Sequence, residues 1–236
     1  MQHIQLDIRD GETLAIIGGS GSGKSTLLRL MIGLIRPTSG EIWIQGREIS
    51  QLAEKEMDEV RLKMGMVFQY SALFDSMTVG DNVAFGLREH TKLSEAEIQS
   101  VVQEKLRLVG LPGIEGAMPN ELSGGMKKRV SLARAIAFGP EIIFYDEPSS
   151  GLDPIMTGKI DELIVEMQRT LRVTSVVVTH DMASACHIAD RIAMIYEGRL
   201  IAIDTVKNFR KLPDPRVQAF MRSMYAEEGK ADVNRS

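Results

Sequence analysis

A glycine-rich loop that carries a lysine and four hydroxyl side chains lies near the start of the chain. The stretch GGSGSGKST, residues 18–26, has the spacing G-x-x-x-x-G-K-[ST] between an apolar strand and a helical pattern. Its glycines allow successive backbone N–H groups to point at a phosphate, and the helix N-terminus adds partial positive charge. We expect Lys24 to contact the outer phosphates of a nucleotide and Ser25 to bind Mg²⁺. The predicted phosphate-binding residues are Gly18, Gly19, Ser20, Gly21, Ser22, Gly23, Lys24, Ser25 and Thr26.

Two carboxylates end an apolar stretch, IIFYDE, much further along the chain. We expect this strand beside the phosphate loop, with Asp146 holding the Mg²⁺ shell and Glu147 polarising a water in line with the γ-phosphate. Gln69 and His180 end two other apolar stretches, MGMVFQ and VVVTH. A lone glutamine is more often a surface residue, but here its amide can reach Mg²⁺ and the attacking water. We expect His180 to hydrogen-bond the γ-phosphate.

A second, incomplete anion site lies in the stretch NELSGGMKKR, residues 120–129. If Ser123 caps a helix, the first N–H groups and the flexible pair Gly124 and Gly125 form an anion site. No lysine follows at phosphate-loop spacing, so this site cannot bind a nucleotide alone. We predict that it completes the site of a second copy, in a head-to-tail homodimer that buries two ATP molecules. The alternative is a helix start that merely contains glycines.

The elements that must position these residues follow from hydrophobic periodicity. Alternation over residues 4–8 and a turn at Asp10 and Gly11 predict a hairpin that leads into a buried strand. The stretch EIWIQG predicts another alternating strand, and a helix is expected from about residue 24 to 34. Further strands are predicted at residues 65–69, 142–147, 173–180 and 191–196, and further helices at residues 155–171 and 182–189.

Residues 75–139 have a helical pattern, with Thr78, Ser94 and Ser123 at cap positions. Strand–helix alternation on both sides of this segment predicts an α/β fold of the phosphate-loop NTPase type. We expect a parallel sheet, an N-terminal antiparallel β part and an inserted helical subdomain, residues 75–139. The whole chain, residues 1–236, is expected to form one domain, with C-terminal helices and a polar tail over residues 205–236.

Composition excludes several classes of protein. The 236 residues are 44% hydrophobic and 25% charged, as in globular proteins, and the net charge of −4 gives no sign of a nucleic-acid partner. Cys186 is the one cysteine of the sequence, so the chain cannot form an internal disulfide. No apolar run approaches the roughly 20 residues of a membrane span, and the N-terminus lacks a signal-peptide pattern. Any work at a membrane is therefore expected through a partner.

Together these motifs resemble the nucleotide-binding subunit of ABC transporters. GGSGSGKST, Gln69, LSGGM, IIFYDE, SSGLDP and VVVTH occur in the order and spacing of that family, over essentially the whole chain. The resemblance implies a dimer in which LSGG of one subunit lies on the ATP of the other. It also implies that Ser150 to Asp153 form the loop where the subunits touch, which adds Asp153 to the nucleotide site. Gly19 stands where many members have proline.

A closer resemblance is to the ATPases of MCE-type lipid transporters, such as the Mla phospholipid system and its plastid and cyanobacterial relatives. It rests on residues 68–90, on the segment from LSGGM to LDPI with its methionine, and on PDPRVQAFM. It implies a peripheral subunit on the cytoplasmic or stromal face of the inner membrane. Its implied partners are an integral membrane permease and an MCE-domain lipid-binding protein.

The nucleotide motifs fit more than one function. An importer ATPase for a polar solute and a soluble ABC-type assembly ATPase share the nucleotide motifs.

In this family an aromatic residue that stacks on adenine precedes the loop, at a spacing that falls before Met1, so the chain resembles a member without its first segment. The wall of a permease-binding groove is predicted, with core packing as the alternative, at Phe68, Leu73, Phe74, Val79, Val83 and Phe85.

Overall fold

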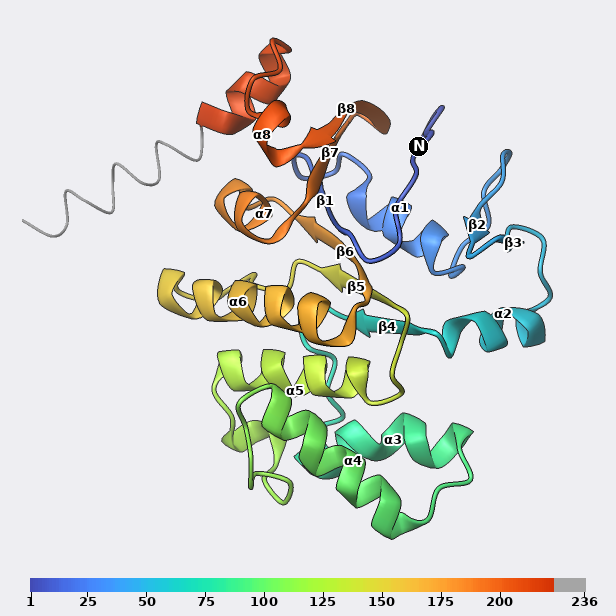
Figure 1. Ribbon diagram of the computed structural model, residues 1–236, viewed down its shortest axis with the longest axis vertical. Helices are drawn as coiled ribbons and strands as arrows, with labels where there is room; N and C mark the ends of the chain where they lie inside the picture. Colours follow the sequence, from blue (N-terminus) through green and yellow to red (C-terminus); the bar gives the residue numbers. More distant parts are fainter. Residues whose placement is uncertain (223–236) are drawn as a thin grey trace, which may run out of the picture.

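A six-stranded sheet forms the centre of the computed structural model, which describes residues 1–222 (Figure 1). The first five strands along the sheet are parallel, and the last is antiparallel to its neighbour. Parallel pairing brings the carboxyl ends of the strands to one edge, where the predicted site residues follow them. In spatial order the strands are β4 (Met64–Val67), β5 (Ile142–Asp146), β6 (Thr174–Thr179), β1 (Thr13–Ile17), β7 (Arg191–Tyr196) and β8 (Arg199–Thr205).

The predicted hairpin before β1 is wrong. β1 pairs in parallel with β6 on one side and with β7 on the other, so neither of its edges is free for residues 4–8. These residues form no strand, and Ile4, Leu6 and Ile8 instead pack against the core around Leu14. The alternation therefore reports one buried face of an extended segment, without strand pairing.

Helices cover both faces of the sheet. Alternate residues of β1 point to opposite sides: Leu14 and Ile16 pack against α1 (Lys24–Met31), whereas Ala15 and Ile17 pack in the cluster with α7 (Met182–Ile188). On the second side, α5 (Gly124–Ile136) and α6 (Pro154–Leu171) share a core with β4, β5 and β6. This alternation explains why the strands are apolar on both faces.

Smaller elements lie beyond the edges of the sheet. The antiparallel β part consists of β2 (Trp43–Ile44) and β3 (Arg47–Glu48), and α2 (Glu54–Arg61) follows it. At the other edge, α8 (Val206–Phe209) and a helix over residues 215–222 follow β8. The predicted polar tail after residue 222 lies outside the described residues. Within residues 1–222, none of the helices combines the length and hydrophobicity that crossing a bilayer requires.

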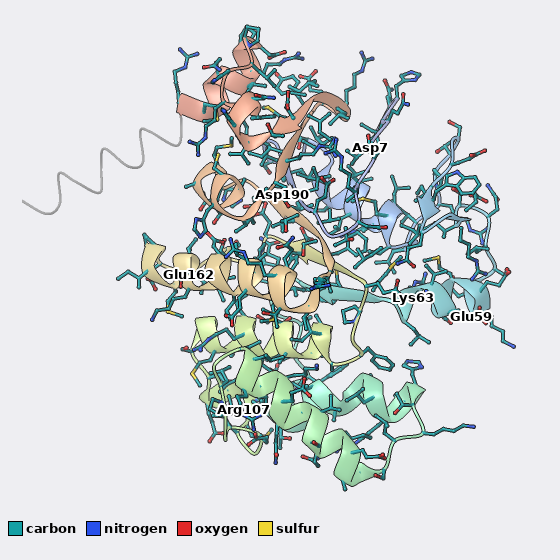
Figure 2. The ribbon with its side chains drawn as sticks, in the orientation of Figure 1. Asp7, Glu59, Lys63, Arg107, Glu162 and Asp190 are labelled. Atoms are coloured by element: carbon teal, nitrogen blue, oxygen red, sulfur yellow. The ribbon has the colours of Figure 1, made fainter. Side chains whose placement is uncertain are left out.

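The helical segment forms a layer of its own next to α6 (Figure 1). It contains α3 (Val79–His90), α4 (Glu95–Leu108), the 3-10 turn η1 (Pro119–Glu121) and α5. The predicted caps are present: the hydroxyls of Thr78, Ser94 and Ser123 accept bonds from N–H groups three residues later. Figure 2 shows Arg107 in this layer, at the end of the molecule opposite to Asp7 and Asp190.

A buried ion pair ties the turn before β1 to the start of β7. Glu12 Oε1 accepts bonds from the backbone N–H of Arg9, at 2.9 Å, and from the Arg191 guanidinium, at 3.0 Å. Both side chains of the pair are almost fully buried. Replacing Glu12 would therefore leave the buried Arg191 charge with one acidic partner, the exposed carboxylate of Asp7 at 3.5 Å.

We predict that Glu12→Gln lowers the free energy of unfolding by about 3–5 kcal/mol, because breaking a buried pair from one side costs that much. Urea unfolding followed by circular dichroism measures the change. The control is Glu104→Gln, because the Glu104 carboxylate that pairs with Lys105 is exposed, and we expect about 0–1 kcal/mol. Equal losses of unfolding free energy in the two variants would contradict the stabilising role of the Glu12–Arg191 pair.

A second prediction concerns the buried carboxyl of Asp161, which joins α6 to α7 by accepting a bond from the Ser184 hydroxyl. Burial raises the pKa of Asp161 from its usual 3.8 to about 6; the Ser184 bond and His187 oppose the shift, and Asp181 adds to it. The folded state therefore binds more protons between these values, and the stability that protonated Asp161 contributes is lost as pH rises through about 6.

Relative to Asp161→Asn, the wild type should lose on the order of 1–3 kcal/mol of unfolding free energy between pH 4 and pH 7. Denaturant titrations of both proteins across this range measure the difference. The neighbouring variant Glu162→Gln, at an exposed position of α6, is the control, because it changes a carboxyl on the same helix and leaves the Asp161–Ser184 bond in place. A flat difference for Asp161→Asn would refute the prediction.

Candidate nucleotide-binding site

The phosphate loop connects the buried end of β1 to the start of α1. Gly23 caps the helix with a φ of 108°, a conformation that a residue with a Cβ rarely adopts. The Lys24 ammonium folds back over the loop and donates to the carbonyl oxygens of Gly18, at 2.8 Å, and Gly19, at 3.2 Å. With Lys24 only 8% exposed, the cation lies inside the loop, where a bound phosphate would lie.

The turn between β7 and β8 supports the loop from behind. The Gly198 N–H donates to the Ser22 carbonyl at 2.9 Å. A Cβ at Gly18 would collide with the carbonyl oxygen of Ile195, so only glycine fits this approach. The buried Ser22 hydroxyl has no hydrogen-bond partner among residues 1–222, and a phosphate oxygen fits that need.

The predicted metal residues Ser25 and Asp146 meet at the carboxyl edge of the sheet. In the sheet, β6 lies between β5 and β1. Even so, the Ser25 hydroxyl donates to Asp146 Oδ1 at 3.4 Å. Burial and the adjacent Glu147 raise the pKa of Asp146, so a cation at this position would be favourable.

These oxygens fit Mg²⁺, which binds proteins through few carboxylates and takes its other ligands from water and substrate phosphates. Residues 1–222 contain no group of three or more His, Cys, Asp or Glu that could hold a metal.

Glu147 and His180 form a direct pair at the same edge. Glu147 Oε2 lies 2.8 Å from His180 Nδ1 and 3.3 Å from its backbone N–H. The Glu147 side chain is 12% exposed and that of His180 is 65% exposed, so the histidine holds the carboxylate from the solvent side. Glu147 has a φ of 49°, a strained conformation that changes the direction of the chain directly after β5.

Gln69 lies two residues beyond β4, and its amide donates to the Ser150 hydroxyl at 3.4 Å. The structure thus brings Gln69 next to the loop that the resemblance assigned to the subunit contact. A residue that the sequence analysis missed also lies here: the Lys128 ammonium bonds to the Gln69 carbonyl. The only sequence signal for Lys128 is its position in the basic run after LSGG.

The second anion site does not join the phosphate loop within one subunit. Ser123 and Gly124 are exposed at the start of α5, whereas Gly125 is buried against Met156. α5 and α1 pack on opposite faces of the sheet (Figure 1). Asp153 caps the adjacent α6 through the N–H groups of Ile155 and Met156, both at 3.0 Å.

The predicted groove wall divides into surface and core. Val79 and Val83 are fully buried in the helical layer, so they are wrong as wall residues. Phe68, Phe74 and Phe85 are exposed, and the rings of Phe74 and Phe85 lie 4.9 Å apart. Leu73 is partly buried against the core, and Tyr70, which was not predicted, is exposed beside these aromatic residues in the sequence.

Comparisons with known proteins agree with this geometry. The family model described as ABC transporter matches residues 1–150. The intermembrane phospholipid transport system ATP-binding protein MlaF of Haemophilus influenzae is 44% identical over 93% of this chain and 83% of its own length. The probable ribonucleotide transport ATP-binding protein mkl of Mycobacterium leprae is 43% identical over 93% of this chain. The chain spans 63% of the length of mkl.

A solved structure shows the same fold. The ATP-binding cassette MJ0796, in a dimeric post-hydrolysis state bound to ADP and Pi, superposes with a TM-score of 0.78 and 35% identity. The match covers 85% of this chain and 88% of that one. The phosphate loop, the carboxylates at the sheet edge and these matches lead to one conclusion: the chain belongs to the ABC transporter family, as an ATP-binding domain.

Proposed function

We propose that this chain is the ATP-hydrolysing subunit of a phospholipid transporter. The hydrolytic part of this proposal rests on one observation: the Ser25 hydroxyl lies 3.4 Å from Asp146 Oδ1, and the Glu147 carboxylate is one residue further along the chain. In this arrangement the phosphate loop binds ATP, and Glu147 orients and polarises the attacking water. His180 holds Glu147 in place and lies where it can contact the γ-phosphate.

The remaining polar residues of the site support this chemistry. Ser25, Gln69 and Asp146 would hold Mg²⁺, which neutralises charge on the phosphate oxygens when it is bound. The Lys24 ammonium would exchange its loop carbonyls for the outer phosphates of ATP. Phosphoryl transfer depends chiefly on positioning and on such stabilisation of charge.

We further propose a head-to-tail homodimer that completes each site. The exposed start of α5 offers Ser123, Gly124 and the first N–H groups to the γ-phosphate of a partner subunit. Ser150 to Asp153 lie beside Gln69 and the start of α6, where a subunit contact would reach the hydrolytic residues. The dimeric state named for MJ0796 supports this arrangement.

Phospholipid is the substrate that we favour, because MlaF and the MCE-type resemblance in residues 68–90 point the same way. The ribonucleotide transport for which mkl is named keeps a polar solute as the competing substrate. The exposed aromatic residues Phe68, Tyr70, Phe74 and Phe85 support docking of a permease helix. An MCE-domain protein would carry the lipid, with this subunit on the cytoplasmic or stromal face of the membrane.

Glu147→Gln should lower the rate of ATP hydrolysis by about 10²- to 10⁴-fold, because an amide cannot accept the proton of the attacking water. ATP should remain bound, so the dimer should accumulate in gel filtration with ATP. Steady-state phosphate release measures the rate. Glu162→Gln, an exposed glutamate on α6, is the control and should behave like the wild type. Unimpaired hydrolysis by Glu147→Gln would remove Glu147 from the proposed role.

The substrate is tested in the intact complex, purified with its own permease and reconstituted in liposomes. Phospholipid should stimulate ATP hydrolysis and should move between membranes only when ATP is present. The Lys24→Ala complex is the control, since it keeps the assembly but loses the phosphate contact. Stimulation by ribonucleotides or amino acids, with none by phospholipid, would favour the polar-solute alternative.

A further inference from the structure

Lys128 connects three parts of the molecule that lie far apart in the sequence. It belongs to α5, five residues beyond Ser123, and its ammonium bonds to the Gln69 carbonyl. The same ammonium donates to the Glu147 carbonyl at 3.4 Å. Gln69 and Glu147, which we propose to position the attacking water, therefore have their backbone carbonyls bonded to the same ammonium group.

The environment of Lys128 indicates a specific role. Its side chain is only 6% exposed, although lysine is rarely buried without partners. Burial lowers the pKa of Lys128, and the carboxylates of Glu147 and Asp146 oppose that shift. The ammonium thus lies within the electrostatic field of the hydrolytic site, while its side chain originates from the opposite, helical side.

The backbone is strained at Glu147 and in the segment directly after Gln69. Glu147 has a φ of 49°, and in the segment after Gln69 both Ser71 and Ala72 are left-handed, with φ of 63° and 48°. Such conformations are costly for residues with a Cβ and persist only when the surroundings hold them. Arg134, also on α5, bonds to the carbonyls of Ser71, at 2.9 Å, and Ala72, at 2.7 Å. One helix therefore holds the whole segment.

We propose that Lys128 is a positioning residue for ATP hydrolysis, which fixes the backbones of Gln69 and Glu147 in its own subunit. This inference rests on the proposed function, because it assigns Gln69 and Glu147 to the hydrolytic step. Ser123 and Lys128 lie about 7.5 Å apart along the helix axis, so α5 forms a rigid link between them. In the proposed dimer, α5 contacts the partner's ATP at its start and positions its own subunit's water through Lys128.

The test compares Lys128→Met, which removes the charge and donors at similar volume, with Lys128→Arg, which keeps them. Lys127→Met is the matched control, because the neighbouring Lys127 makes neither contact. We expect Lys128→Met to lower kcat by about 10- to 100-fold, with KM for ATP and the melting temperature nearly unchanged. Lys128→Arg should recover most of the turnover, and Lys127→Met should match the wild type.

A second measurement needs neither nucleotide nor metal. Hydrogen exchange at residues 69–72 and 147–150 should become about tenfold faster in Lys128→Met, while exchange in the sheet stays as in the wild type. Wild-type turnover together with unchanged exchange in Lys128→Met would overturn the role of Lys128 and leave the proposed function intact. Equal losses in Lys128→Arg and Lys128→Met, with both folded, would also overturn it. A wild type without ATP hydrolysis would refute the proposed function, and the exchange result would still decide whether Lys128 holds these segments.

Discussion

Opposite charges held at the edge of an apolar parallel sheet are the constraint on which the rest of the structure depends. Lys24 follows the fully buried strand β1, and Asp146 ends β5, whose three central residues are buried, so water screens both charges only in part. They can stay there only because backbone carbonyls, a hydroxyl and each other's fields compensate them. The parallel register of β5, β6 and β1 brings these groups to one edge.

The helical layer contributes to that edge from the other side of the sheet. Its helices bury their apolar sides in one core with β4, β5 and β6, and this packing fixes the position of α5. Cations on α5 then hold the carbonyls of the segment after β4, whose left-handed residues would otherwise relax. The exposed aromatic residues Phe68 and Phe74 flank this same segment. A force on that surface and a contact at the start of α5 would therefore act on the same few backbone groups.

Much of this arrangement could be predicted from local signals, since runs such as IIFYDE and caps such as Ser94 depend on nearby residues alone. The hairpin was wrong because alternation reports a buried face but does not identify the strand partner. α2 was missed because its residues are mostly charged, and β8 because it is only half-buried and pairs at an edge. Lys128 was missed because its two carbonyl partners come from Gln69 and Glu147, which no local pattern connects to it.

The close contact between Gly18 and the Ile195 carbonyl shows how far the phosphate loop depends on distant sequence. The loop is moulded against the β7–β8 turn, which lies more than a hundred and seventy residues later in the chain. The nine residues GGSGSGKST therefore do not specify the loop conformation alone. Grafted onto another strand–helix connection, they would keep their composition but lose the contact that shapes the loop. Insertions at the β7–β8 turn, which lies outside the nucleotide motifs of the sequence, would in turn change the conformation of the phosphate loop.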